Sequence, residues 1–452
     1  MGTFDGLNVG LSALYAQRRA IDVTGQNIAN VNTDGYSRQR VNTVADAGPS
    51  TPALFSRADG TGRGVRSVDV IRTRDDFLET RAHQEHASSA YLGQLQTVMG
   101  RIELGFAEPS DIGLAAQMAD FWAGWDDVGL NPSDPAARSQ LLERATTLAS
   151  GFQQLDSTLA GLGASSVEQL QATIAEVNAT AGRIAELNGT IRTAVSSGLS
   201  PNDLMDQRDL LVLQLSDQVG ATARPGADGA IDVYVGAMAI VRSSSVEELA
   251  VEVTADAVTG EPQVDVVWKD DRLDATVGGR SKALIETHNV IIPDQRDAIA
   301  GVADELRAVV NGVHMAGYDE AGVGGIEFFV GVAGQLTVNS DIVDNPSLIA
   351  ASGVPGGKVD GGNARKMAEQ IGPDTSYRDV VVQLGVESQT ITRRTQMQQT
   401  ITDQLDAERE SVSGVNIDEE MTNLVAFQHA YSAAARFVTT VDEMLDTLIR
   451  MV

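Results

Sequence analysis

The stretch Ile417–Ile449 near the end of the chain, "IDEEMTNLVAFQHAYSAAARFVTTVDEMLDTLI", decides the fold that the sequence predicts. Apolar residues recur in it at alternating spacings of four and three, which is the heptad pattern of a helix that packs lengthwise on another helix. The pattern continues to the last residue, and only Gln428 and Asp442 break it. Its positions are Ile417, Met421, Leu424, Gln428, Tyr431, Ala435, Val438, Asp442, Leu445, Ile449 and Val452.

A second, weaker heptad pattern occupies the start of the chain. It runs through Leu7, Leu11, Leu14, Arg18, Ile21, Gly25 and Ile28. A single stripe of this kind is most often an ordinary core-facing helix. Two stripes at the two ends of one chain, where helices fray most easily, predict terminal helices that pair with each other and with copies from neighbouring subunits.

Composition limits the classes of partner. The 452 residues carry a formal net charge of −29 and contain no cysteine. The acidic balance argues against a nucleic-acid partner and an anionic membrane surface, because both require clustered Lys and Arg. Residues 1–75 carry a net +2 and residues 406–452 a net −6, so the ends are complementary in sign. The N-terminus lacks the pattern of a cleaved secretory signal.

The middle of the chain predicts a helical bundle with a small β unit. Capping and periodicity predict helices over 84–106, 111–128, 134–161, 166–196 and 201–218. Alternating apolar residues predict an antiparallel β unit within about 219–280. Helix resumes near Ser281, breaks at Pro293, gives way to a Gly-rich loop over 317–375 and starts again near Ser376. The predicted fold class is mainly α: terminal helices pair as a coiled-coil-like domain, and an elongated helical bundle carries an antiparallel β subdomain.

Residue patterns for catalysis are weak. The sequence "HQEH" at 83–86 has a metal-like spacing, but no third ligand lies near it, so we interpret it as solvated helix surface. The sequence "DQRD" at 206–209 has the composition of a salt-bridged helix surface, and there is no "GxSxG" nucleophile motif. We therefore predict no enzymatic activity, no cofactor and no metal. A metal-dependent hydrolase built on "HQEH" is a distant alternative, which metal analysis of the purified protein would test.

The sequence "NIANVNTDGYSRQRV" at 27–41 is the most informative short segment. Its amides suit the unpaired backbone groups where a helix stops, its glycine suits a positive φ, and its arginines alternate outward from an extended chain. A capped helix end explains any one of these features but not all of them in this order. We predict that contacts between subunits are made by Asn27, Asn30, Asn32, Gly35, Tyr36, Arg38 and Arg40.

Both ends of the chain resemble one known family. The sequences "SALYAQRRAIDVTGQNIANVNTDGYSRQRV" at 12–41 and "SGVNIDEEMTNLVAFQHAYSAAARFVTTVDEMLDTLI" at 413–449 are similar to the terminal signatures of bacterial flagellar axial proteins, the rod, hook and hook-associated subunits. The internal blocks "LMDQRDLLVLQLSDQVG" at 204–220 and "VVNGVHMAGYDEAGVGGIEFF" at 309–329 resemble the hook-associated subunits of the hook–filament junction. Another axial protein, a hook or distal rod subunit, is the alternative.

The resemblance implies a structural subunit with two domains. Residues 1–75 with 406–452 would form an inner tube domain, and residues 76–405 an outer helical domain. Members of the family commonly insert a large outer domain after the "FF" block, whereas here Phe328 and Phe329 precede only a short, turn-rich stretch. We therefore expect most of that insertion to be absent.

The resemblance also implies partners and a location. The expected partners are copies of the same chain, the hook protein, the second hook–filament junction protein and a flagellar export chaperone. The expected location is the extracellular flagellum, reached by type III export without a cleaved signal peptide. We expect the chaperone to cover the C-terminal seam, formed by Met421, Leu424, Tyr431, Val438, Leu445 and Ile449.

Overall fold

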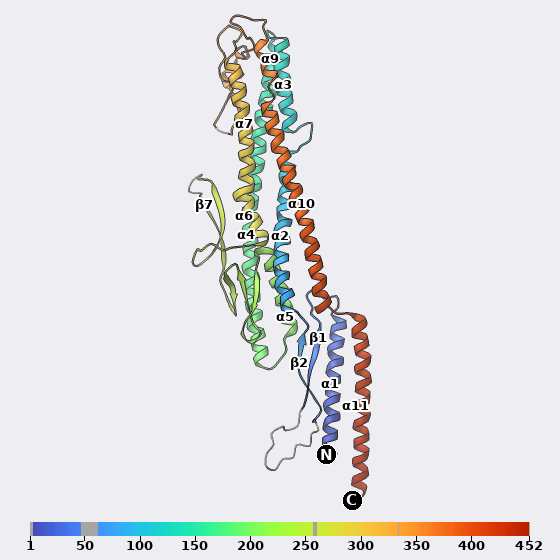
Figure 1. Cartoon of the computed structure of the whole chain (residues 1–452). Coiled ribbons are helices and arrows are strands. Elements are labelled where there is room, and N and C mark those ends of the chain that lie inside the picture. The colour runs from blue at the N-terminus through green and yellow to red at the C-terminus, as the bar shows by residue number, and fades with distance from the viewer. Residues whose placement is uncertain (1–2, 47–61, 256–259, 333, 452) are drawn as a thin grey trace.

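The computed structural model describes residues 3–46, 62–255, 260–332 and 334–451. Long helices lie side by side and form a slender rod (Figure 1). Two terminal helices and a strand pair extend from one end of the rod, where both chain termini lie (Figure 1). None of the helices in these ranges is long and apolar enough to cross a membrane. Val452, the last position of the heptad pattern, lies outside the described residues.

The two terminal helices pack antiparallel on one another, which confirms the predicted pairing. They are α1 (Thr3–Ala29) and α11 (Ile417–Met451), and beside them lies the antiparallel pair β1 (Gln39–Ala45) and β2 (Val65–Arg72). We call these four elements the terminal module. The helices pack tightly at Gly10, where an added Cβ would lie 2.6 Å from Val438 Cγ2.

Seven longer helices of the described residues make up most of the rod. Figure 1 shows α2 and α10 running side by side from the terminal module towards the far tip. The helices are α2 (Asp76–Phe106), α3 (Leu114–Leu130), α4 (Pro135–Ser196), α5 (Asn202–Val219), α6 (Gly279–Glu286), α7 (Ile292–Met315) and α10 (Gly372–Ser413).

The sequence predicted two helices where the structure has the single helix α4 of 62 residues. Ser165 and Glu168 have the spacing of a capping box and predicted the second start, but Ser165 lies inside the helix, where its Oγ accepts from Gln169 Nε2 at 3.1 Å. At the same level Gly163 lies against Ile292, where an added Cβ would be 3.4 Å from the Ile292 side chain. Packing against α7 therefore overrides the weak helix propensity of this Gly- and Ser-containing segment.

The predicted break at Pro293 is also different in the structure. A π-helical turn, Thr287–Ile291, joins α6 to α7 without interruption, and Pro293 sits in the first turn of α7. Proline is tolerated there because the first backbone N–H groups of a helix have no intrahelical acceptor. The π-turn adds one residue to a helical turn, and the helix continues through the position where the sequence predicted a break.

In the part of the chain that the structure describes, the strands between α5 and α6 form two small antiparallel sheets. The four-stranded sheet has the order β3–β4–β5–β6, and a separate pair is formed by β7 and β8. Their buried faces join α4 and α5 in one apolar cluster. The strands are β3 (Thr222–Pro225), β4 (Ile231–Val235), β5 (Met238–Arg242), β6 (Ser245–Val246), β7 (Leu249–Ala255) and β8 (Pro262–Trp268).

The Gly-rich segment predicted as loop lies at the far tip and contains short elements. They are β9 (Phe329–Val330), β10 (Thr337–Val338), α8 (Ser340–Asp344) and α9 (Gly362–Ala368). The final rod helix, α10, starts at Gly372 rather than near Ser376 and continues past residue 406 to Ser413. The division of the chain into an inner and an outer domain stays a prediction.

Candidate assembly site

Asn27, in the last turn of α1, joins three elements of the terminal module. Its Nδ2 donates to the carbonyl of Gln39 at 2.9 Å and to Glu420 Oε2 at 3.0 Å. Its Oδ1 accepts from the Tyr36 hydroxyl at 2.9 Å and from the Gln39 amide at 3.0 Å. The side chain is 1% exposed. These four bonds use both donors and both lone pairs of the amide, so Asn27 ties α1 to β1 and α11.

The helix end beside Asn27 is capped by its own chain. Asn30 Nδ2 donates to the carbonyl of Gln26 at 3.0 Å, and Thr33 Oγ1 donates to Asn30 Oδ1 at 3.2 Å. Gly35 has a φ of +77°, a left-handed conformation that glycine adopts without steric cost. The segment thus turns the chain from α1 into β1 and brings Tyr36 back to Asn27.

Arg38 is held by two carboxylates at the start of α11. Its Nε donates to Glu420 Oε1 at 2.8 Å and its Nη2 to Glu419 Oε1 at 2.9 Å. Burial disfavours the charge of Arg38, but these bonds outweigh it and raise its pKa. Burial, together with the nearby carboxylates, also raises the pKa of Tyr36. Tyr36 therefore stays protonated and remains a donor to Asn27.

The structure brings part of the predicted subunit-contact set together. Asn27, Tyr36 and Arg38 meet in one network, whereas Asn32 and Arg40 are exposed and have no polar side-chain partner in the described ranges. The amide of Asn27 is fully used inside its own chain. A role between subunits stays a prediction for the set, and its exposed members are the ones free to fill it.

Sequence analysis missed that the terminal module meets the start of α5. The Ser37 amide donates to Asp206 Oδ2 at 3.0 Å, and Gln39 Nε2 donates to Asp203 Oδ1 at 3.1 Å. The prediction of a salt-bridged helix surface for "DQRD" is confirmed for the ion pairs of Asp206 and Asp209 but wrong for the surface, because Asp206 is 6% and Arg208 3% exposed. The available signal was a run of four consecutive polar residues in the mostly apolar helix sequence "LMDQRDLLVLQL", since buried charges need partners.

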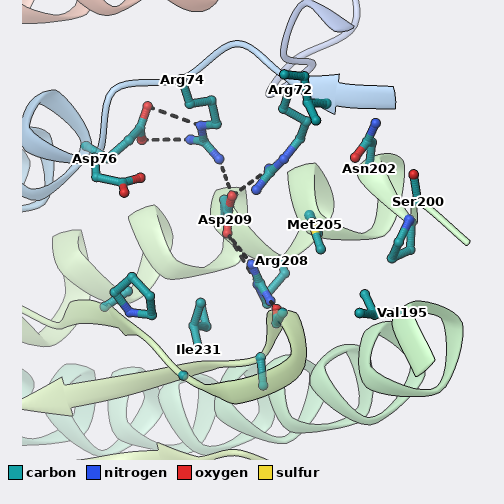
Figure 2. Close-up of a pocket in the computed structure, with 18 of the residues that line it drawn as sticks. Arg72, Arg74, Asp76, Val195, Ser200, Asn202, Met205, Arg208, Asp209 and Ile231 are labelled. Atoms are coloured by element: carbon teal, nitrogen blue, oxygen red, sulfur yellow. Dashed lines mark hydrogen bonds and ion pairs between the residues drawn. The ribbon is translucent and has the colours of Figure 1, made fainter. Parts of the chain in front are cut away.

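Two arginines, one at the end of β2 and one just after it, complete the contact between the terminal module and α5 (Figure 2). Arg72 Nη1 lies 2.8 Å from Asp206 Oδ1 and 2.7 Å from Asp209 Oδ2. Arg74 also pairs with Asp209, and its Nη2 lies 2.7 Å from Glu79 Oε2. Burial disfavours the charged form of Asp209, but the surrounding arginines lower its pKa. A cleft of about 670 Å³ lies beside these pairs.

The "HQEH" histidines sit in opposite environments at the base of α2. His83 is 7% exposed, and burial lowers its pKa to about 4. The pKa of His86 is raised, first by its hydrogen bond with Asp217 and then by Asp406, whose Oδ2 lies 3.0 Å from Nε2. The prediction of a solvated surface is therefore wrong for His83. In the described residues, no group of three or more His, Cys, Asp or Glu side chains is arranged to hold a metal.

The predicted C-terminal seam divides between two faces of α11. Leu424, Val438 and Leu445 are half-buried, whereas Met421, Tyr431 and Ile449 are 48%, 39% and 72% exposed. Sequence analysis missed further exposed apolar side chains, notably Phe437 at 46% and Met444 at 53%. The available signal was that α11 has a third apolar residue in its heptads, which packing against one partner helix cannot cover.

Family models cover most of the chain. The model of the flagellar hook-associated protein FlgK helical domain matches residues 99–329. The model of the flagella basal body rod protein matches residues 7–36, and that of the flagellar basal body rod FlgEFG protein C-terminal region matches residues 408–451. The two ends and the rod thus match separate descriptions within one group of flagellar proteins.

Individual relatives agree with these models. The chain is 30% identical over 502 residues to flagellar hook-associated protein 1 of Bacillus subtilis, covering 99% of this chain and 98% of the relative. It is 24% identical over 555 residues to flagellar hook-associated protein 1 of Escherichia coli, covering 98% and 99%. Both alignments are longer than this chain, so each relative carries segments that this chain lacks.

One solved structure shares the fold. It is the flagellar hook junction protein FlgK from Burkholderia pseudomallei, matched with a TM-score of 0.50 at 23% identity. The match covers 56% of this chain and 46% of that chain.

Proposed function

This chain belongs to the family of flagellar hook-associated protein 1 and is a structural component of the bacterial flagellum, and we propose that it polymerises at the junction between hook and filament. The observation that supports this most is how few apolar side chains the terminal module buries. Among the described residues, its buried apolar side chains are Ala16 and Val441, and none of its residues belongs to an apolar core cluster. A helix pair with so little core gains burial when other copies pack on it.

The exposed side chains of α11 support packing between copies. Met421, Val425, Phe437 and Met444 are each between 46% and 53% exposed and lie on a helix whose inner face is already taken by α1. Exposed apolar residues in such number mark an interaction surface. In this proposal neighbouring terminal modules cover them, and the exposed Asn32 and Arg40 make polar contacts at the rim.

The remaining partners follow from the family. We place the hook protein on one side of the assembly and the second junction protein on the other. The same apolar face of α11 would be a hazard in an unassembled subunit, so a dedicated export chaperone covers it before assembly. Export through the flagellar type III channel would then deliver the subunit to the extracellular flagellum without a cleaved signal peptide.

Gene deletion followed by microscopy tests the position in the flagellum. Cells that build hooks but release unassembled filament protein are the expected result. Cells without hooks would instead favour a rod or hook subunit. That alternative has less support, because the similarity to the flagellar hook protein FlgE of Borreliella burgdorferi covers only 16% of this chain.

Charge substitutions test the surface. Phe437→Asp with Met444→Asp should abolish filament attachment when the variant gene is returned to the deletion strain. The matched control is Val382→Asp with Val386→Asp, two residues of α10 with 57% and 58% exposure. Attachment lost in both variants, or in neither, would contradict a specific role of the terminal module.

A pull-down tests the chaperone. Leu424→Asp with Tyr431→Asp should abolish capture of the subunit by the chaperone, because both residues belong to the C-terminal seam that the chaperone is expected to cover. Undiminished capture would show that the chaperone binds another surface.

A further inference from the structure

We propose that the far tip of the rod carries an acid-operated catch, which holds residues 346–352 closed while His314 is neutral and releases them when His314 is protonated. The catch consists of His314 of α7, Arg138 of α4 and the peptide group between Ile349 and Ala350. We call residues 346–352 the tip segment. The inference concerns the tip alone, so it depends neither on the terminal module nor on where the subunit assembles.

Hydrogen bonds fix the protonation state of His314, which lies in the last turn of α7 and is 0% exposed. The amide of Ala350 donates to His314 Nε2 at 2.9 Å. A backbone amide can only donate, so Nε2 must carry a lone pair and not a proton. The proton of the neutral ring is then on Nδ1, which donates to the carbonyl of Ile326 at 2.6 Å. Both bonds therefore require the neutral ring in this one tautomer.

Arg138 holds the other side of the same peptide group. Its Nη1 donates to the carbonyl of Ile349 at 2.8 Å and to that of Pro346 at 3.1 Å. Arg138 is 4% exposed, and it keeps its charge because a guanidinium is not deprotonated in proteins. The cation polarises the peptide group, which strengthens the bond that the amide of Ala350 donates to His314. One peptide group of the tip segment thus connects α4 to α7.

The tip segment covers part of the aromatic core. The ring centroid of His314 lies 6.0 Å from that of Trp125 and 5.4 Å from that of Phe328. Ile349 and Ala351 of the tip segment are 0% and 1% exposed and belong to the same apolar cluster as these two aromatic residues. Release of the tip segment would therefore open this core to water.

Protonation of His314 would break the catch in two ways. A proton on Nε2 would face the amide proton of Ala350, so that bond would be lost. The new positive charge would also lie near Arg138. Burial lowers the pKa of His314 to about 4; the bond to Ile326 opposes this shift, and the charge of Arg138 adds to it. The closed tip thus disfavours the charged ring, and an open tip would accept it.

The neighbouring elements bring no carboxylate to His314. Among the described residues, its hydrogen bonds are those to Ile326 and Ala350, and it forms no ion pair. Asp319 and Glu320, in the loop after α7, favour the charge of Arg138 instead. Asp360 accepts from the amides of Gly353 and Gly362, and Asp127 of α3 pairs with Arg144. Four further charged side chains are exposed and screened by water: Asp126 of α3, Glu327 before β9, and Arg365 and Lys366 of α9.

Hydrogen exchange of the full chain, followed by mass spectrometry, tests the catch. The bonds of neutral His314 stabilise the closed tip fully above pH 6.5, and this contribution is lost as the pH falls towards 4. Opening takes up one proton, so the open fraction should rise about tenfold for each unit of pH in this range. Exchange of peptides from the tip segment should rise by the same factor after correction for the intrinsic rate. Peptides from residues 170–185 of α4 are the internal reference and should not follow this rise.

A matched pair of variants assigns the effect to His314. In His314→Gln the side-chain carbonyl can accept from Ala350 and the amide can donate to Ile326, and neither group titrates. The rise of tip exchange on acidification should disappear in this variant. His83→Gln removes the other buried histidine with a pKa of about 4 and should leave the rise at the tip unchanged. The same rise in His314→Gln as in the natural chain would overturn the proposal.

The natural chain and a second variant decide the matter if His314→Gln does not fold. In the natural chain, tip exchange that does not rise on acidification, or that rises equally in the α4 reference, would contradict the catch. Arg138→Gln should speed up tip exchange already at pH 6.5, because it removes the cation from the Ile349 carbonyl. Arg101→Gln, an exposed arginine of α2, is its control and should leave tip exchange as it is. Equal tip exchange in both arginine variants would also overturn the proposal.

Discussion

The rod and the terminal module are built from the same kind of long helix but are stabilised in different ways. In the rod, the aromatic rings of Phe121, Trp125, Phe328 and Phe329 pack within a continuous apolar core. In the terminal module, a buried amide, Asn27, and the charged pair of Arg38 and Glu420 connect the elements. The rod therefore buries its apolar core within a single chain. In the terminal module, polar contacts fix how the elements are arranged, but burial of apolar side chains contributes little free energy.

Truncating a phenylalanine in each region should show the largest difference. Phe328→Ala empties a fully buried site and should lower the free energy of unfolding of the rod by about 3–5 kcal/mol. Phe437→Ala removes a side chain that is 46% exposed and should change stability by about 0.5 kcal/mol at most. Urea denaturation followed by circular dichroism measures both. Equal losses would mean that the module has a core comparable to that of the rod.

Acid should weaken the rod through His83. The folded protein holds this histidine neutral, with a pKa of about 4 against the ordinary 6.5, so the unfolded chain binds a proton first as the pH falls. Its contribution to stability is present above pH 6.5 and is lost as the pH falls towards 4, by roughly 3 kcal/mol. His83→Gln should remove that part of the loss, and His429→Gln, on the exposed face of α11, should not. Identical pH profiles for all three proteins would rule out this role.

A methyl group at Gly10, where the terminal helices pack tightly, should loosen the module. In Gly10→Ala the new Cβ meets Val438 at 2.6 Å and Phe437 at 3.1 Å, which should cost about 2 kcal/mol of helix pairing. The control is Gly25→Ala, where nothing lies within 4 Å and the change should stabilise α1 by up to about 1 kcal/mol. Hydrogen exchange of the α1 amides distinguishes them. Faster exchange in the Gly25 variant would count against this account.

A rise in pH above 6.5 should slightly weaken the end of the rod next to the terminal module, through His86. Its pKa is raised, so its charged bonds to Asp217 and Asp406 contribute fully below pH 6.5 and are lost as the pH rises through the raised value. We expect a loss of about 1 kcal/mol, because the pairs are partly exposed. His86→Gln should flatten the alkaline side of the stability profile and leave the acid side to His83. An unchanged alkaline side in that variant would contradict the assignment.

Features with a local signal were predictable. Heptad spacing predicted the terminal helices because every turn of a packed helix repeats the requirement for an apolar residue. Capping residues predicted the start of α4, where Asp134 Oδ1 accepts from the Ala136 amide at 2.9 Å. The strand pair of β1 and β2 was not predicted. β1 has the sequence "QRVNTVA", whose apolar and polar residues do not alternate regularly enough to distinguish a strand from an extended loop.

Features that depend on distant residues were not predictable. Arg72 and Asp206 are 134 positions apart. The residues around each of them give no indication that the two side chains form an ion pair. Likewise, "HQEH" has the same spacing whether α2 is free or packed. The structure differs between its two histidines, because His83 is buried whereas Asp217 of α5 and Asp406 of α10 raise the pKa of His86. The sequence singled out Asn27, but it did not indicate that its amide bonds to Gln39 and Glu420 of the same chain. A contact between subunits stays a prediction for this residue.

The antiparallel arrangement of α1 and α11 leaves the far tip of the rod free of both chain ends. The tip is connected to the terminal module through α4 and its neighbours, and a helix of 62 residues extends on the order of 90 Å. Extra residues accepted by the tip loops therefore lie far from the terminal module. For protein engineering, the tip is the position at which a foreign domain could be displayed, whereas a tag fused to either terminus would lie at the free end of the terminal module (Figure 1).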